Sequence, residues 1–204
     1  MIRKLLACAG LLLSLDACTG PPPPKMVDAF TDVYTASSSA AVPVNAPVTV
    51  QPPVGLIFSE NVEAHIGAVK NATEYWGKVV PASLTNTVAL ADNNPLYFSG
   101  KVLELLKRHF PSAAPIHDFN EAVQKGMRSV ILVDLRMKYA EPYGDRTSKM
   151  DIDLYFFSSA MTPVSKLNGH SEFTLGYPAI TTGMQKMTNE AIAELDRKIS
   201  TTVR

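Results

Sequence analysis

The chain has 204 residues, of which 46% are apolar and 19% are charged, and its 19 basic and 19 acidic side chains cancel. This composition excludes a disordered polyelectrolyte, a collagen-like chain and a protein that crosses a membrane many times. Because the formal charge is zero and no basic run occurs, the sequence also argues against an electrostatically driven nucleic-acid binder.

The first residues have the pattern of an export signal. Arg3 and Lys4 precede the apolar stretch 5–15, which is long enough for a signal-peptide core and too short to span a bilayer as a mature helix. The sequence Leu15-Asp16-Ala17-Cys18 follows. It resembles the lipobox of bacterial lipoproteins, in which a leucine and a small residue precede the modified cysteine. The alternative is an ordinary secretory signal with a chance cysteine.

The lipobox resemblance has consequences for the mature protein. It implies cleavage after residue 17, a diacylglyceryl group on the Cys18 sulfur and an acyl chain on the new amino group, enough for stable anchoring. Thr19 follows the cysteine, which by analogy with enteric lipoproteins favours the outer membrane, with the domain facing the periplasm. Cys8 leaves with the signal, so the mature chain has neither an intrachain disulfide nor a cysteine zinc site.

The composition divides the chain into three parts: a signal peptide at 1–17, a Pro/Ser/Ala-rich tether at 18–51 and a single domain at 52–204. Eight of the fifteen prolines fall between residues 21 and 53. We expect the tether to be extended or disordered and to bury no core, with a reach on the order of 100 Å if it is fully polyproline-like. The remaining length is enough for one domain with its own core.

The first half of the domain has one short strand and two helices with clear signals. A strand is expected over 54–58, a helix over 101–110 with Ser99 as its N-cap, and a helix over 119–125 whose Asp118 and Glu121 form a capping box. The stretch 60–91 is ambiguous: 62–76 fits either a helix or a strand with a loop, and 79–90 favours at least one strand.

The second half alternates apolar and polar residues, which predicts strands over 129–139, 149–157 and 167–175, with a hairpin tip at 141–146. Asn168-Gly169 could instead form a tight turn. A closing helix is expected over 181–199. The fold class is therefore α+β: a mixed or antiparallel sheet of about four to five strands with helices on one face, in the order β-β-α-α-β-β-β-α.

This organisation resembles several small envelope lipoproteins, namely the YajG-like lipoproteins, the curli-secretion lipoprotein and the N-terminal domain of TolB. The resemblance rests on the lipidated Cys18, the proline-rich tether and the element order over 54–199. It implies an accessory domain that binds an envelope protein partner, assembles into rings or helps to export or assemble surface polymers. It carries over no catalytic residue.

The residue types that usually carry catalysis or bind metals form no recognisable motif here, so we predict no catalytic residue, no metal and no cofactor. The four histidines are not at metal-ligand spacing, and nucleophile-elbow and phosphate-loop patterns are absent from the sequence. Asp151 and Asp153 lie two apart on the outward face of one strand, where they could serve a metal-dependent envelope hydrolase. The other interpretation is a solvated strand face opposite Arg136 or Lys138.

Four side chains are candidate partner contacts. Tyr155 and Phe157 share the polar strand face with Asp151 and Asp153, so they are covered either internally, by the tether or by 60–91, or by a partner. Tyr143 and Arg146 lie at the hairpin tip and have the side chains that interfaces favour. The leading hypothesis is a non-catalytic accessory or binding protein of envelope assembly or export, with an envelope enzyme and a self-assembling ring subunit as alternatives.

Overall fold

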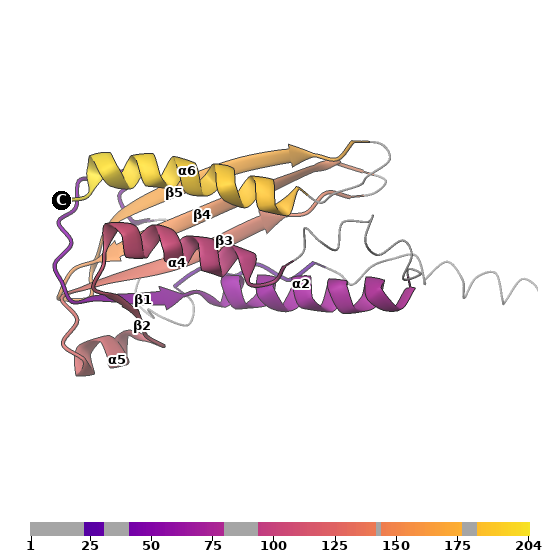
Figure 1. Cartoon of the computed structure of the whole chain (residues 1–204). Helices are drawn as coiled ribbons and strands as arrows, with labels where there is room; N and C mark the ends of the chain where they lie inside the picture. The colour runs from indigo at the N-terminus through magenta and orange to yellow at the C-terminus, as the bar shows by residue number, and fades with distance from the viewer. Residues whose placement is uncertain (1–22, 31–40, 80–93, 142–143, 177–182) are drawn as a thin grey trace, which may run out of the picture.

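The computed structural model describes residues 23–30, 41–79, 94–141, 144–176 and 183–204. Within them, helices and strands follow one another as β1 (Val54–Phe58), α2 (Glu60–Val79), α4 (Tyr97–His109), β2 (Ala113–Pro115), α5 (Phe119–Gln124), β3 (Ser129–Lys138), β4 (Thr147–Phe157), β5 (Pro163–Thr174) and α6 (Met184–Thr202). Figure 1 shows these elements as one elongated sheet with helices along it. None of the helices in these ranges is long and apolar enough to span a bilayer.

The sheet has five strands in the order β2-β1-β3-β4-β5. β1 pairs in parallel with both β2 and β3, whereas β3, β4 and β5 form an antiparallel meander. Parallel neighbours need a crossover, and the helices between β1 and β3 provide it. The predicted fold class, α+β with a mixed sheet, is confirmed.

One face of the sheet, called here the helix face, is covered by α4, α6 and the start of α2 (Figure 1). Alternate residues of β3 and β4, among them Ile131, Leu135 and Leu154, are completely buried here. α6 forms the expected closing helix and presents an apolar stripe, with Met187, Ala191, Leu195 and Ile199 buried. Gly169 of β5 lets this helix approach, because a Cβ there would lie 2.2 Å from the Ala191 carbonyl oxygen. Asn168-Gly169 is therefore inside a strand, and its interpretation as a turn is wrong.

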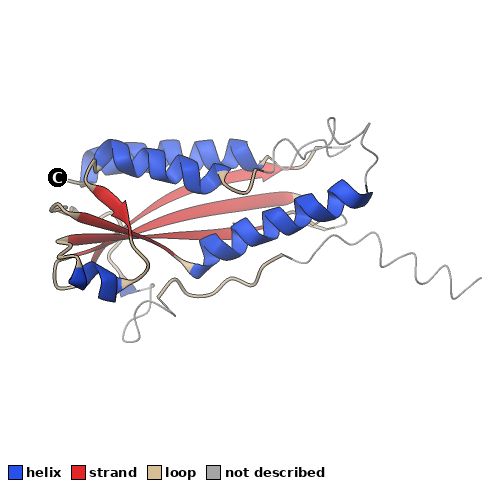
Figure 2. Ribbon diagram, turned by 60° about the horizontal axis from the view of Figure 1, so that its bottom comes forward, coloured by secondary structure: helices blue, strands red, loops and turns tan. Residues whose placement is uncertain are grey.

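The other face, called here the segment face, is covered by α5 and by the N-terminal stretch 23–30 (Figure 2). Its core contains Ile57, Val130, Leu132, Tyr155 and Phe157, with Ala29, Phe30 and Val42 packed onto them. α4 and α6 thus share one face, as expected, whereas α5, which was expected on the same face, lies on the opposite one.

The expectation that 20–51 buries no core is wrong for the described parts of that stretch. Phe30 is 1% exposed and Val42 is 5% exposed. The average composition of the stretch is that of a tether. A few apolar side chains are nevertheless enough to fix an extended chain onto the apolar surface of the sheet.

Residues 41–50 also run along the edge of the sheet. The Lys166 N–H donates to the Pro43 carbonyl oxygen, and the Asn45 N–H donates to the Lys166 carbonyl oxygen. Further on, Val48 forms a parallel bridge with Val203 at the end of the chain. The stretch therefore ties the start of β5 to the C-terminus.

The ambiguous stretch after β1 is a single helix. α2 runs over Glu60–Val79, so the strand interpretation of 62–76 is wrong. Val62, Ile66 and Val69 recur at helical spacing on its inner side, and Glu60 and Glu63 are favourable in the first turn. Most of the strand expected over 79–90 lies outside the described residues. β2 was not predicted, because three residues show no period.

The ends of the next two helices differ in how well they were predicted. α4 begins at Tyr97, before the proposed cap Ser99, and its N-cap Leu96 makes no side-chain hydrogen bond. By contrast, Asp118 caps α5 as predicted by accepting from the Glu121 N–H at 2.7 Å. The Glu121 carboxylate in turn accepts from the N–H of His117, the residue before the cap, so the pair satisfies one open amide of the helix and one amide of the chain that leads into it.

Candidate functional site on the segment face

The segment face has an apolar half and a charged half. Alternation along β4 places Asp151, Asp153, Tyr155 and Phe157 on this face, as predicted, and leaves Leu154 on the helix face. The aromatic pair lies at the end of the strand, whereas the two carboxylates lie near its middle. Because the pattern changes along one strand, the same sheet surface presents two kinds of chemistry.

The apolar half is closed by the chain itself. The Phe30 ring meets Tyr155 edge-on with 5.1 Å between ring centroids and lies 5.6 Å from Phe157. Phe119 of α5 packs on the other side of Phe157, at 4.7 Å. Tyr155 and Phe157 are 2% and 1% exposed, so internal cover by the tether accounts for them. They do not present a free contact surface as long as residues 23–30 stay in place.

A buried amide holds the same stretch by its backbone. Asn61, in the first turn of α2, donates to the Val27 carbonyl oxygen at 2.8 Å and accepts from the Val27 N–H at 2.9 Å. Its amide also donates to Asp134, which accepts a second hydrogen bond from Ser59. Asn61 and Asp134 are each 1% exposed, so a polar group left without a hydrogen bond at this place would cost folding free energy. Burial raises the pKa of Asp134 above its ordinary value, and its two hydrogen-bond donors oppose this shift.

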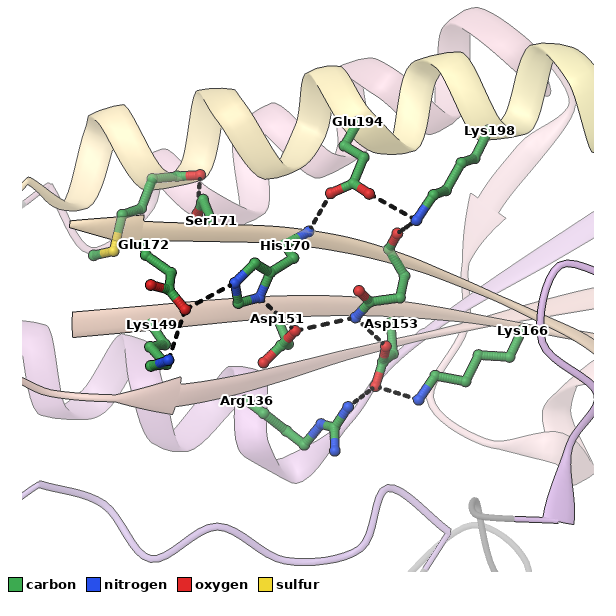
Figure 3. Close-up of polar contacts among 12 residues, drawn as sticks. Arg136, Lys149, Asp151, Asp153, Lys166, His170, Ser171, Glu172, Glu194 and Lys198 are labelled. Carbon is green, nitrogen blue, oxygen red and sulfur yellow. Dashed lines mark hydrogen bonds and ion pairs between the residues drawn. The ribbon is translucent and has the colours of Figure 1, made fainter. Parts of the chain in front are cut away.

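The charged half is organised around the buried Asp153 (Figure 3). Its carboxylate is completely buried and pairs with Arg136 at 2.7 Å and Lys166 at 2.8 Å. The Asn168 amide donates to the other carboxylate oxygen at 2.7 Å. The Lys166 ammonium also lies 5.1 Å from the centroid of the Tyr155 ring, which links the two halves of the face.

Beyond Asp153 the polar side chains become accessible. His170 lies between Asp151, at 2.9 Å, and Glu172, at 3.3 Å, and Glu172 is paired with Lys149 (Figure 3). The hydrogen bond that the His170 ring donates to the Asp151 carboxylate raises the pKa of His170 above its ordinary value. The hydrogen bond from Lys149 lowers the pKa of Glu172. This part of the face therefore offers neighbouring positive and negative groups to solvent.

α6 covers part of the outer edge of β5. The Glu194 carboxylate accepts from the His170 backbone N–H at 2.7 Å, and the Lys198 ammonium donates to the Asn168 carbonyl oxygen at 2.7 Å (Figure 3). Together with the bonds that Lys166 makes to residues 43 and 45, these contacts occupy edge groups that a foreign strand would need. The middle of β5 is thus poorly suited to strand addition.

The two candidate carboxylates are not equivalent. Asp153 is enclosed by two cations, whereas Asp151 is partly exposed beside His170. The interpretation of a solvated face opposite Arg136 fits Asp151, which the strand register pairs with Arg136, but it is wrong for Asp153, which is completely buried. Among the described residues, no three His, Cys, Asp or Glu side chains form a group that could hold a metal ion. No observation here favours the hydrolase alternative over the structural interpretation.

The remaining predicted site residues are placed only in part. Arg146, at the start of β4, donates from its guanidinium to the Gly176 carbonyl oxygen, so it ties the hairpin end to the end of β5. Tyr143 and the lipidation candidate Cys18 lie outside the described residues.

Sequence reasoning missed the residues that hold the stretch 23–30. Asp134 carried a signal, because alternation along 129–139 places it outward beside Arg136 and Lys138. Asn61 and Ser59 carried none, since their partners are 34 to 75 residues away in the sequence.

Comparison with known proteins adds little. No family model and no curated protein matches the chain. The similar solved structures include the PelC dodecamer from Paraburkholderia phytofirmans and a single-substitution variant of it. They cover 76% and 74% of this chain and 92% and 94% of their own, at 7% and 6% identity and TM-scores of 0.42 and 0.41. At these values the likeness carries no functional argument, and the proposals below rest on this chain's own residues.

Proposed function

We propose that this chain is a lipid-anchored, non-catalytic periplasmic protein of a bacterial outer membrane, which binds a partner protein in envelope assembly or export. The lipobox-like Leu15-Asp16-Ala17-Cys18 supports the anchor. The observation that carries the proposal is the docking of residues 23–30 on the sheet, because it fixes the domain close to the predicted anchor.

The length of the link sets the largest distance between the domain and the proposed anchor. Eight residues, 19–26, separate Cys18 from Val27, whose backbone is held by Asn61, and the fully extended chain from residue 18 to residue 27 spans at most about 32 Å. The tether expected from composition alone would allow on the order of 100 Å. A short link confines the domain to a thin layer beside the membrane, which raises its effective concentration for a partner held in the same layer.

The charged half of the segment face and the adjoining hairpin end are the surface proposed for that partner. Arg136, Lys149 and Glu172 have side chains 50%, 43% and 45% exposed, and Arg146 and the predicted contact Tyr143 belong to the hairpin end. A mixed-sign surface on a rigid sheet favours a protein partner with a complementary polar surface and disfavours nucleic acid. No cofactor is needed for this role.

Intact-mass spectrometry of the protein purified from native membranes tests the anchor. The expected mass is that of residues 18–204 plus one diacylglyceryl group and one acyl chain on the amino group. A Cys18→Ser chain should keep its signal and lose the lipid mass. An unmodified N-terminus, or a mature chain that starts after residue 18, would refute the anchor.

Site-specific photo-crosslinking in intact cells tests the binding surface. A photoreactive residue in place of Lys149 should give a discrete adduct with an envelope protein. The control position is Glu104 on α4, which is similarly exposed and lies in the opposite layer. Equal labelling from both positions, or adducts with neither, would contradict the proposed surface.

A further inference from the structure

The contacts that hold residues 27–30 are those of a protein recognising a short peptide. We propose that the surface formed by Asn61, Phe119, Tyr155 and Phe157, called here the Phe30 site, is a peptide-binding site. It is filled here by residues 27–30 of its own chain, and it takes the same residues of a second copy when two chains meet. This inference goes beyond the proposed function and does not require the lipid anchor.

The first element of recognition reads the backbone. Asn61 satisfies both the N–H and the carbonyl group of Val27, at 2.9 Å and 2.8 Å. A side-chain amide that makes this reciprocal pair reproduces the contact of a neighbouring strand at one residue. Asp134 holds the amide in this orientation from behind, at 2.8 Å. The orientation of the amide is therefore supported by the folded domain and not only by residues 27–30.

The second element reads one aromatic side chain. The Asp28 carboxylate accepts from the Phe30 N–H at 2.9 Å, which closes a tight turn. At the end of this turn the Phe30 side chain points toward the sheet. Phe30 is 1% exposed among the rings of Tyr155 and Phe157. Recognition thus needs a backbone at one position and a phenyl ring three residues later, and both can come from any copy of residues 27–30.

The covalent link allows a neighbouring copy to supply these residues. Ten residues, 31–40, join Phe30 to the stretch that lies along β5, and a chain of this length can extend to about 35–40 Å. That distance exceeds the thickness of one sheet layer with its helices, so a second domain can lie within reach. Occupation in cis competes at a high effective concentration, which keeps exchange rare in the unaltered protein.

A mixing experiment with two differently tagged full-length chains in detergent tests the proposal. Phe30→Ala leaves the site intact and removes the ring that fills it, whereas Asn61→Ala damages the site and leaves the ring. Mixed together, they should form one intact contact between chains. We expect recovery of the mixed pair at least about tenfold above either variant with itself, because competition in cis is gone.

Each outcome of the mixing experiment decides. Recovery of the mixed pair no better than that of each variant with itself overturns the proposal. Leu96→Ala serves as a control, because it removes an exposed apolar side chain away from the Phe30 site. Equal pairing in all combinations, this control included, would assign association to another surface and would also overturn the proposal.

A peptide experiment keeps the proposal testable if Asn61→Ala fails to fold. A fluorescent peptide with the sequence of residues 25–32 should bind the full-length Phe30→Ala chain. The same peptide with alanine in place of its phenylalanine should bind at least about tenfold more weakly. Equal binding of both peptides, or none by either, would overturn the proposal.

Discussion

The two faces of the sheet are closed by different means. The helix face is covered by α4 and α6, whose apolar stripes have the same period as the elements that carry them. The segment face is covered by α5 and by residues 23–30, which form no regular element and are held by the buried amide of Asn61 and by the contacts of one aromatic ring, Phe30. The comparison teaches that one face is closed by regular helices, whereas the other is closed in part by an irregular segment from a distant part of the sequence.

The largest effect is expected from a cavity in the helix face. Leu154→Ala should lower the free energy of unfolding by about 3–4 kcal/mol, because Leu154 is completely buried between the sheet and its helices and nothing can refill the space. Chemical denaturation would measure the loss. A change below about 1 kcal/mol would mean that this face is not the main core.

The next effect concerns the buried carboxylate of the segment face. Asp153→Asn should cost about 2–3 kcal/mol, since Lys166 would lose its charge partner, while Arg136 is half exposed and can turn to water. Asp145→Asn is the matched control, because Asp145 pairs with Lys138 at the surface and its loss should change stability little. Equal losses for the two variants would show that Asp153 does not organise this face.

The two faces should also respond to pH in opposite senses. Burial lowers the pKa of His65 beside the helix face to about 4, so the unfolded chain binds the proton first as the pH falls below 6.5. This costs about 2 kcal/mol between pH 7 and pH 5. His170 on the segment face has a raised pKa, so its contribution is present at low pH and is lost as the pH rises through that pKa. Unfolding of His65→Gln and His170→Gln across this range should show slopes changed in opposite directions; slopes changed in the same direction would refute the assignment.

A smaller global effect is expected from the docked segment. Phe30→Ala should cost only about 1–2 kcal/mol, less than a typical buried phenylalanine, because the segment can leave the sheet and the loss cannot exceed its docking free energy. Phe30→Leu should retain most of the stability. A loss for Phe30→Ala as large as that for Leu154→Ala would show that both faces belong to one inseparable core.

The strands and the closing helix could be predicted because their signals are local. Alternation along 149–157 correctly placed Tyr155 and Phe157 on the same side as the carboxylates, and Asp118 and Glu121 correctly predicted the start of α5. The stretch 60–79 was ambiguous in sequence, because its apolar residues fit both the period of a helix and that of a strand. Only its packing on the sheet selects the helix.

The docking of the N-terminal segment could not be predicted in the same way. Phe30 is one apolar residue in a stretch whose average composition is that of a tether, and its partners Tyr155 and Phe157 are more than a hundred residues later. Asn61 also gives no signal in the sequence pattern, because its role is a contact with the backbone of Val27 and backbone contacts leave no periodicity. Sequence reasoning left internal cover of the aromatic pair open, and the fold supplies the residue that provides it.

Amide hydrogen exchange at Val27 tests the central claim, that residues 23–30 are part of the folded domain and shorten its link to the membrane. The account predicts that the Val27 N–H, bonded to Asn61, is protected in the unaltered protein and loses that protection in Phe30→Ala, while amides in β3 and β4 stay protected. Exchange of Val27 at the rate of an unstructured peptide in the unaltered protein would contradict the account.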